Sequence, residues 1–231
     1  MKRLKGEWLQ IAILLLPFCA AALLWDRLPE RIPIHWNARG QVDGYAGKVF
    51  AALLMPLLNI GIALLISVVM FIDPRIRKAD AEGRANFARV VKAVRLISTA
   101  FFAAVSLAVI GIGAGLALDM SRVVGVGLAL LIGLLGNFLG KVRPNYLVGV
   151  RTPWTLESRE VWIKTHRLTG RLMVGASVVM LLACFTVPPA IAFWVNMGLL
   201  MLVSIVSILY SFFAYRKQEQ GSGSGKQAVK G

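Results

Sequence analysis

The segment GNFLGKVRPNYLVGVRTPWTLESREVWIKTHRLTG, residues 136–170, separates two apolar runs, Val123–Gly140 and Leu172–Val187. It is polar and basic, and it contains Asn, Trp, Thr and His side chains. A simple connection between two membrane helices does not require this density of such residues. Long apolar runs on both sides of the segment therefore predict membrane-spanning helices joined by a loop with a role of its own.

The composition of the whole chain is that of a membrane protein. Of its 231 residues, 58% are hydrophobic, whereas soluble domains contain about 45–50% apolar residues. The mean hydropathy is +0.71. The two cysteines, Cys19 and Cys184, each lie inside an apolar run. We interpret them as small hydrophobic residues and not as a disulfide or a redox pair.

Six apolar runs approach the length that a membrane helix needs, which is about 20 residues for a hydrocarbon core of about 30 Å. They are Trp8–Trp25, Val49–Ile72, Val94–Leu118, Val123–Gly140, Leu172–Val187 and Ala190–Tyr215. The first run is interpreted as an uncleaved anchor, because it lacks a clear small-residue cleavage site. The predicted fold class is all-α: a polytopic integral membrane protein with about six transmembrane helices.

The basic residues predict the orientation of these helices. The N-terminus, the tail and the loops after the second and fourth runs hold 21 of the 26 lysines and arginines, and the other loops hold five. Basic loops stay in the cytoplasm, so both termini are predicted to be cytoplasmic. The net charge of +15 is thereby explained without nucleic-acid binding.

We expect three parts along the chain. Residues 1–93 form an N-terminal two-span module with an outside loop at 26–48. Residues 94–215 form a four-span region with a cytoplasmic loop at 141–171. Residues 216–231 are predicted to be a flexible tail, since they contain the linker-like GSGSG at residues 221–225, either native or engineered.

The outside loop, Asp26–Lys48, carries the first set of candidate residues. Apolar side chains alternate at Ile32, Ile34 and Trp36, which predicts a short strand, and turn-forming residues follow. Two interpretations remain open for this loop: an interfacial cap, or a recognition surface for something that arrives from outside. The candidate binding residues are His35, Trp36 and Asn37.

The inside loop carries the second set. Thr152, before Pro153, or Thr155 itself is predicted to cap a helix that continues towards Gly170. This segment is amphipathic and basic, so it is predicted to lie at the membrane surface near anionic lipid, or to dock a cytoplasmic partner. A folded-back structural loop is the alternative. The candidate residues are Asn137, Asn145, Arg151, Thr152, Pro153, Trp154, Thr155, Trp162, His166 and Arg167.

Common catalytic and transport patterns are absent from the sequence. All 11 acidic residues lie in loops or at helix ends, whereas ion-coupled transporters usually carry ionisable groups in mid-membrane. The predicted topology places the two histidines on opposite sides of the bilayer, and no protease, P-loop or zinc motif is found. We therefore expect no catalytic residue, no metal and no cofactor.

Two blocks of residues resemble the SdpI family of bacterial membrane proteins. The first block consists of Leu28-Pro29, Ile32-Pro33, His35-Trp36-Asn37, Gly40 and Gly44–Lys48, and it is similar to a short module of unknown function that often precedes SdpI regions. The second consists of Gly136-Asn137, Arg143-Pro144-Asn145, Gly149, the run RTPWTL at 151–156, Trp162, Thr165-His166-Arg167 and Gly170. The resemblance covers roughly residues 8–215.

The resemblance implies a multi-pass protein of the bacterial cytoplasmic (inner) membrane. It implies immunity against a secreted, membrane-active peptide toxin, and signalling in which the membrane protein holds a transcriptional repressor at the membrane. A toxin or envelope signal outside and a regulator protein inside are then the expected partners, beside the lipid bilayer. Two alternatives stay open: a small transporter or exporter of a hydrophobic substrate, and a membrane enzyme that uses His166 and Arg151 near lipid headgroups.

Overall fold

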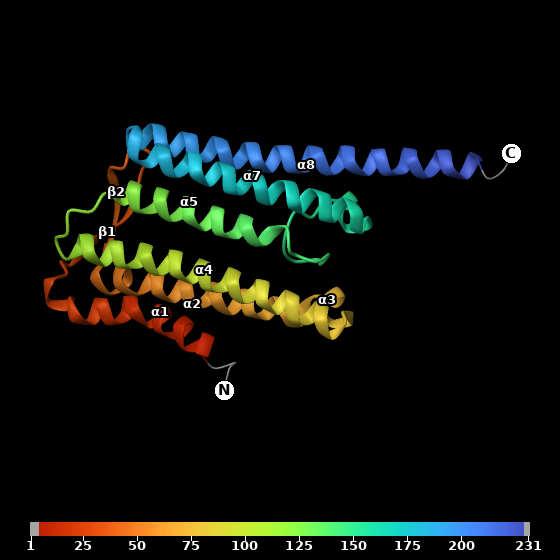
Figure 1. The fold of residues 1–231 in the computed structure, drawn as a ribbon. Helices are drawn as coiled ribbons and strands as arrows, with labels where there is room; N and C mark the ends of the chain where they lie inside the picture. Colours follow the sequence, from red (N-terminus) through yellow and green to blue (C-terminus); the bar gives the residue numbers. More distant parts are fainter. Residues whose placement is uncertain (1–4, 229–231) are drawn as a thin grey trace.

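The computed structural model describes residues 5–228, and its long helices run side by side in one bundle (Figure 1). The long helices are α1 (Lys5–Leu23), α2 (Lys48–Ile72), α4 (Ala81–Gly113), α5 (Met120–Leu139), α7 (Arg159–Thr186) and α8 (Pro189–Ala228). The short elements are η1 (Trp25–Arg27), β1 (Arg31–Trp36), β2 (Val42–Gly47), α3 (Pro74–Lys78) and α6 (Pro153–Glu157).

Five of the long helices are long and apolar enough to cross a membrane, and α1 contributes a shorter apolar helix, Glu7–Leu23. The predicted class of polytopic helical membrane protein is confirmed. Leu64 and Leu65 on α2 are exposed, as are Val178 and Leu182 on α7. A helix satisfies its backbone hydrogen bonds internally, so such apolar side chains can face lipid without cost.

The hairpin end of the bundle holds β1 and β2 beside the α4–α5 connection and the α7–α8 turn (Figure 1). The two strands pair antiparallel, with Arg31 opposite Gly47 and irregular register around His35. Ile32 is fully buried and packs with Leu28 at the end of α4. The short strand predicted from the Ile32–Trp36 alternation is confirmed, and it adds a two-stranded sheet to the otherwise helical chain.

The opposite end, here named the loop end, holds α3, α6 and the segment 140–152 (Figure 1). Helix α1 starts towards this end and α8 runs out beyond it (Figure 1). The alternation that the apolar runs predict, with the start of α1 and the end of α8 towards one end, is therefore present in the bundle. That the loop end faces the cytoplasm stays a prediction.

Three helices differ from the predicted boundaries. Helix α4 begins at Ala81 and ends at Gly113, so it starts well before the predicted run Val94–Leu118. The segment before the fifth span is not a separate helix, because α7 runs without a break from Arg159 to Thr186, and that part of the prediction is wrong. The helix begins where Ser158 caps it, its hydroxyl accepting from the Val161 amide. Helix α8 continues to Ala228 through most of the predicted flexible tail, and residues 229–231 lie outside the described part.

Small residues bring α5 and α7 close together. A β-carbon on Gly136 would approach the Gly170 carbonyl oxygen to 2.9 Å, and one on Gly170 would approach the Gly136 carbonyl oxygen to 2.6 Å. Glycines at both positions let the two backbones pack in direct contact. This close packing holds the start of α7 at the loop end.

Candidate functional site

A cavity of about 290 Å³ lies at the hairpin end. Its wall combines the β1 turn with residues of α2, α4, α5, α7 and α8, so it joins segments far apart in the sequence. Most of the lining is apolar, and three methionines, Met55, Met120 and Met197, contribute to it. The candidate residues His35, Trp36 and Asn37 line the same cavity, so the structure brings this predicted group together around one space.

The β1 turn is held by its own polar groups. The Asn37 side-chain oxygen accepts from the amides of Arg39, at 2.9 Å, and Gln41, at 3.1 Å. His35 Nδ1 lies 2.5 Å from Asp43 Oδ1 in an exposed pair. Trp36 packs against the buried cluster at this end of the bundle. Asn37 therefore stabilises the turn. Trp36 is the candidate that both packs against the buried cluster and lines the cavity.

Asn196 on α8 is the most unusual polar group of the cavity. It is 4% exposed, and its side-chain NH₂ points at Cys184 Sγ at 3.9 Å. Its Oδ1 has no hydrogen-bond partner among the described residues. Buried polar atoms are normally paired, so this oxygen is an acceptor without a donor. The sequence indicates Asn196 only as a mid-span polar residue.

The charged and polar side chains at the cavity rim have partners nearby. Arg122 lines the cavity, and its Nε lies 3.4 Å from Asp119 Oδ2. His35 has Asp43 as its partner. Within residues 5–228, no group of three or more His, Cys, Asp or Glu side chains is arranged to hold a metal ion. The lining is thus suited to an apolar ligand and not to a charged one.

At the loop end, Trp162 and His166 form a buried pair on α7. Both are 0% exposed, and their rings stack with centroids 3.9 Å apart. Trp162 Nε1 donates to the Val142 carbonyl at 2.8 Å. His166 Nδ1 donates to the Trp162 carbonyl at 2.8 Å, and its Nε2 accepts from the Val150 amide at 3.0 Å. This geometry requires the neutral imidazole with its proton on Nδ1.

The segment before α6 is folded around a single amide. Asn145 is fully buried, and its NH₂ donates to the carbonyls of Arg143 and Val148, each at 3.0 Å. Its Oδ1 accepts from the amides of Leu147, at 2.9 Å, and Val148, at 2.6 Å. Every hydrogen-bonding position of this side chain has a protein partner, so Asn145 stabilises the loop and is not free to bind a ligand.

The RTPWTL run forms the start of α6. Thr152 caps α6 and makes a capping box with Thr155, so the first of the two predicted caps is confirmed. Pro153 is the first helical residue, and the helix predicted to continue towards Gly170 ends at Glu157. Thr152 also lies 3.2 Å from the hydroxyl of Ser211 on α8. Trp154 meets Phe212 of α8 edge to face at 5.2 Å. These contacts dock α6 on α8.

The remaining loop-end candidates are exposed: Asn137, Arg151, Pro153 and Arg167. Arg151 Nη1 donates to the Tyr146 carbonyl. The loop-end group therefore divides into buried residues that hold the fold and exposed residues at its surface, two of which are arginines. It lies at the opposite end of the bundle from the hairpin, so the two predicted groups do not form one site (Figure 1).

Asp73 is a central residue of the loop end that sequence reasoning missed. It is fully buried, and its Oδ1 caps α3 by accepting from the Arg75 and Ile76 amides. Its Oδ2 accepts from the Tyr146 amide at 2.6 Å, and the Arg75 guanidinium lies over the Tyr146 ring at 4.1 Å. Asp before Pro74 is a helix-start signal, but the link to Tyr146 has no local signal.

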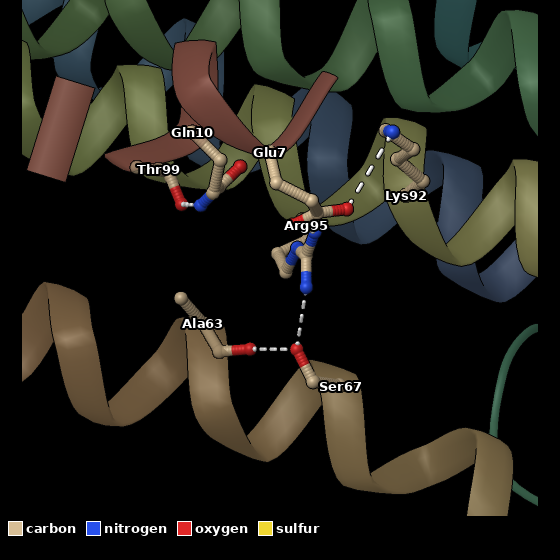
Figure 2. A network of polar contacts seen from close by, with 7 residues as sticks. All are labelled: Glu7, Gln10, Ala63, Ser67, Lys92, Arg95 and Thr99. Carbon is tan, nitrogen blue, oxygen red and sulfur yellow. Dashed lines mark hydrogen bonds and ion pairs between the residues drawn. The ribbon is translucent and has the colours of Figure 1, made fainter. Parts of the chain in front are cut away.

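A second polar group ties α1 to α2 and α4 (Figure 2). Arg95 Nη2 lies 2.6 Å from Glu7 Oε2, and Arg95 Nη1 donates to Ser67 Oγ at 2.9 Å. One turn further along, Gln10 donates to Thr99 Oγ1 at 2.6 Å. In the sequence, Arg95 counts only among the basic residues of a loop. In the structure it lies on α4 and contacts Glu7 on α1 and Ser67 on α2.

Comparison with known proteins gives matches in both halves of the chain. Residues 141–212 match the SdpI/YfhL protein family, and residues 12–60 match a domain of unknown function, DUF1648. The chain is 26% identical over 215 residues to the immunity protein SdpI of Bacillus subtilis (strain 168). The aligned region covers 93% of this chain and 98% of that protein. No solved structure matches the chain. With its bundle of apolar helices, the chain is therefore an SdpI-like multi-pass membrane protein.

Proposed function

We propose that this protein acts in the bacterial cytoplasmic membrane as an immunity protein against a secreted, membrane-active peptide toxin. The observation that carries the proposal is the hairpin-end cavity. Its wall takes Trp36 and Met55 from the region that matches DUF1648, and Cys184 and Asn196 from the region that matches the SdpI/YfhL family. One space thus unites both matched regions, and the similar protein from B. subtilis is an immunity protein by name.

The distribution of basic residues supports the direction of this activity. The loops of the hairpin end hold five of the 26 lysines and arginines, so the positive-inside rule places this end outside the cytoplasm. A toxin that arrives from outside would reach this end first. The cavity is mostly apolar, and Arg122 and His35 at its rim have carboxylate partners, as suits a ligand that partitions into membranes.

The loop end supports a signalling role beside immunity. Asp73, Asn145 and His166 hold the loops there in one folded unit. Arg151 and Arg167 are exposed on this unit. A rigid basic surface at the cytoplasmic end would attract an acidic regulator protein, which would be held at the membrane.

Survival of a toxin-sensitive bacterium tests the proposal. Cells that express the wild type should survive a challenge with a membrane-active peptide of the SDP type, and cells that express Trp36→Ala at matched abundance should not. The matched control is Trp8→Ala, because Trp8 is 66% exposed and lines no described cavity. Equal survival with Trp36→Ala and the wild type would contradict a role for the hairpin-end cavity.

One observation favours a second candidate, a transporter of a hydrophobic substrate. A second cavity, of about 370 Å³, is lined by α5, α7 and α8, which also contribute to the first. Leu128 and Met197 line the first cavity, and Ile132 and Leu200, about one turn away on α5 and α8, line the second. Flux of the toxin across proteoliposomes that contain only this protein would support transport, and toxin binding without flux would refute it.

A further inference from the structure

We infer that Asn196 is the recognition group of the hairpin-end cavity, and that the cavity binds an apolar side chain of the toxin peptide together with one N–H donor of that peptide. This inference deepens the proposed function and rests on it. The donor that the Asn196 amide oxygen lacks inside the protein would come from the ligand.

The first step is the unpaired oxygen. Asn196 lies in the wall of the cavity and is 4% exposed. Its NH₂ faces the weak acceptor Cys184 Sγ, at 3.9 Å, while Oδ1 has no partner among the described residues. Desolvating a carbonyl oxygen without a hydrogen bond is unfavourable. Oδ1 is itself shielded by the side chains around it, so a ligand reaches it by displacing lining side chains. A ligand that then donates to Oδ1 removes this penalty and gains affinity from it.

The second step is the shape and polarity of the space. About 290 Å³ is at the lower limit of small-molecule sites, which measure roughly 300–1,000 Å³. The cavity therefore accepts one or two apolar side chains and not a whole peptide. Met55, Met120 and Met197 are flexible and polarisable, so they adapt to the outline of an apolar group and pack well against aromatic rings.

The third step separates a peptide from a lipid. An acyl chain has no hydrogen-bond donor, so it would fill the space and leave Asn196 Oδ1 unpaired. A peptide carries a backbone amide, and a tryptophan side chain adds an indole N–H, beside its apolar atoms. The lining side chains Arg122 and His35 already have Asp119 and Asp43 as partners, so the rim neither requires nor selects a charged ligand.

The decisive experiment measures binding to the full-length protein in lipid nanodiscs. A synthetic SDP-type peptide should raise the unfolding temperature of the wild type, because a ligand that binds only the folded state stabilises it. Asn196→Leu should reduce the affinity derived from this shift by at least about tenfold. Asn59→Leu is the matched control: Asn59 is also buried with an unpaired Oδ1, but it lines no described cavity, so its affinity should equal that of the wild type.

A second measurement locates the ligand. In a Cys19→Ala background, Cys184 is the only thiol, and it lines the cavity. The peptide should slow its modification by methyl methanethiosulfonate several-fold, and Ala192→Phe, which fills the cavity from α8, should abolish this protection. If Asn196→Leu does not fold, Ala192→Phe decides the question through the shift in unfolding temperature.

Three results would overturn the inference. The first is an unchanged affinity in Asn196→Leu, and the second is protection of Cys184 by the peptide that persists in Ala192→Phe. The third is equal protection of Cys184 when the nanodisc lipid is changed and no peptide is added, which would identify an acyl chain as the occupant. Survival tests keep the two proposals distinct. Cells protected equally by Asn196→Leu and the wild type would refute the site and leave immunity in place. Binding without protection by the wild type would refute immunity and leave the site in place.

Discussion

Replacing Gly149 with alanine tests whether the loop end is pinned to α7 through His166. Gly149 has a φ of +117°, a region in which a β-carbon costs about 1–2 kcal/mol. The new β-carbon would also overlap His166 Nε2. The ring must then move away from the Val150 amide, and leaving this partly buried N–H without a partner costs about 1–3 kcal/mol more. We expect a total loss of about 2–5 kcal/mol in the free energy of unfolding.

Two glycines supply the controls for this prediction. Gly115 has a φ of +95° but nothing within 4 Å of its β-position, and Gly175 lies in α7 with open space around it. Gly115→Ala should therefore cost only the backbone term of about 1–2 kcal/mol, and Gly175→Ala should be neutral or slightly stabilising. Thermal unfolding of the purified protein in detergent measures all three, at about 2–4 °C per kcal/mol for a chain of this length. Equal losses in Gly149→Ala and Gly115→Ala would refute the contact with His166.

Three further predictions concern the loop end, the α1 network and the orientation. Asp73→Ala should lower the free energy of unfolding by about 2–4 kcal/mol, because it removes a helix cap and a charged hydrogen bond to the loop after α5. Asp119→Ala is the control: Asp119 is the exposed cap of α5, and its loss should cost about 1 kcal/mol in the same thermal assay. Glu7→Gln should cost less than about 1 kcal/mol, since its carboxylate is 44% exposed, and a larger loss in that assay would mean that the ion pair holds α1 in place. In intact cells, a membrane-impermeant maleimide should label Arg39→Cys, whereas Lys78→Cys should react only after permeabilisation; the reverse pattern would invert the predicted orientation.

Local signals in the sequence were enough to predict most of the elements. The apolar runs locate the long helices to within a few residues at most of their ends, because a span must be long and apolar whatever it packs against. The alternation of Ile32, Ile34 and Trp36 predicts β1, and Thr152 before Pro153 predicts the start of α6. Each of these features depends on neighbours within a few residues.

The direction of the helix before the fifth span could not be predicted in the same way. Its amphipathic pattern indicates an apolar face but does not say what covers that face. In the structure the cover is protein: Trp162 and His166 pack under the loop that contains Val142 and Val150. With the apolar side chains buried there, the segment does not need the membrane surface, and it continues directly into α7.

The cavity and its polar group also lay beyond sequence reasoning. Trp36 and Asn196 are far apart in the chain, and only the packing of the helices places both in one wall. An asparagine in an apolar run predicts a hydrogen bond between helices, and Asn59 makes one, to the Thr99 carbonyl at 3.1 Å. Nothing near Asn196 in the sequence indicates that its oxygen remains without a donor.

The central claim is that the hairpin-end cavity is where this protein meets the toxin. The most direct test is the survival of a sensitive bacterium across a range of toxin concentrations, with the wild type, Asn196→Leu and Asn59→Leu expressed at matched abundance. The account predicts that the wild type and Asn59→Leu protect at the same toxin concentrations, while Asn196→Leu shifts the curve at least about tenfold towards that of unprotected cells. Full protection by Asn196→Leu would contradict the claim.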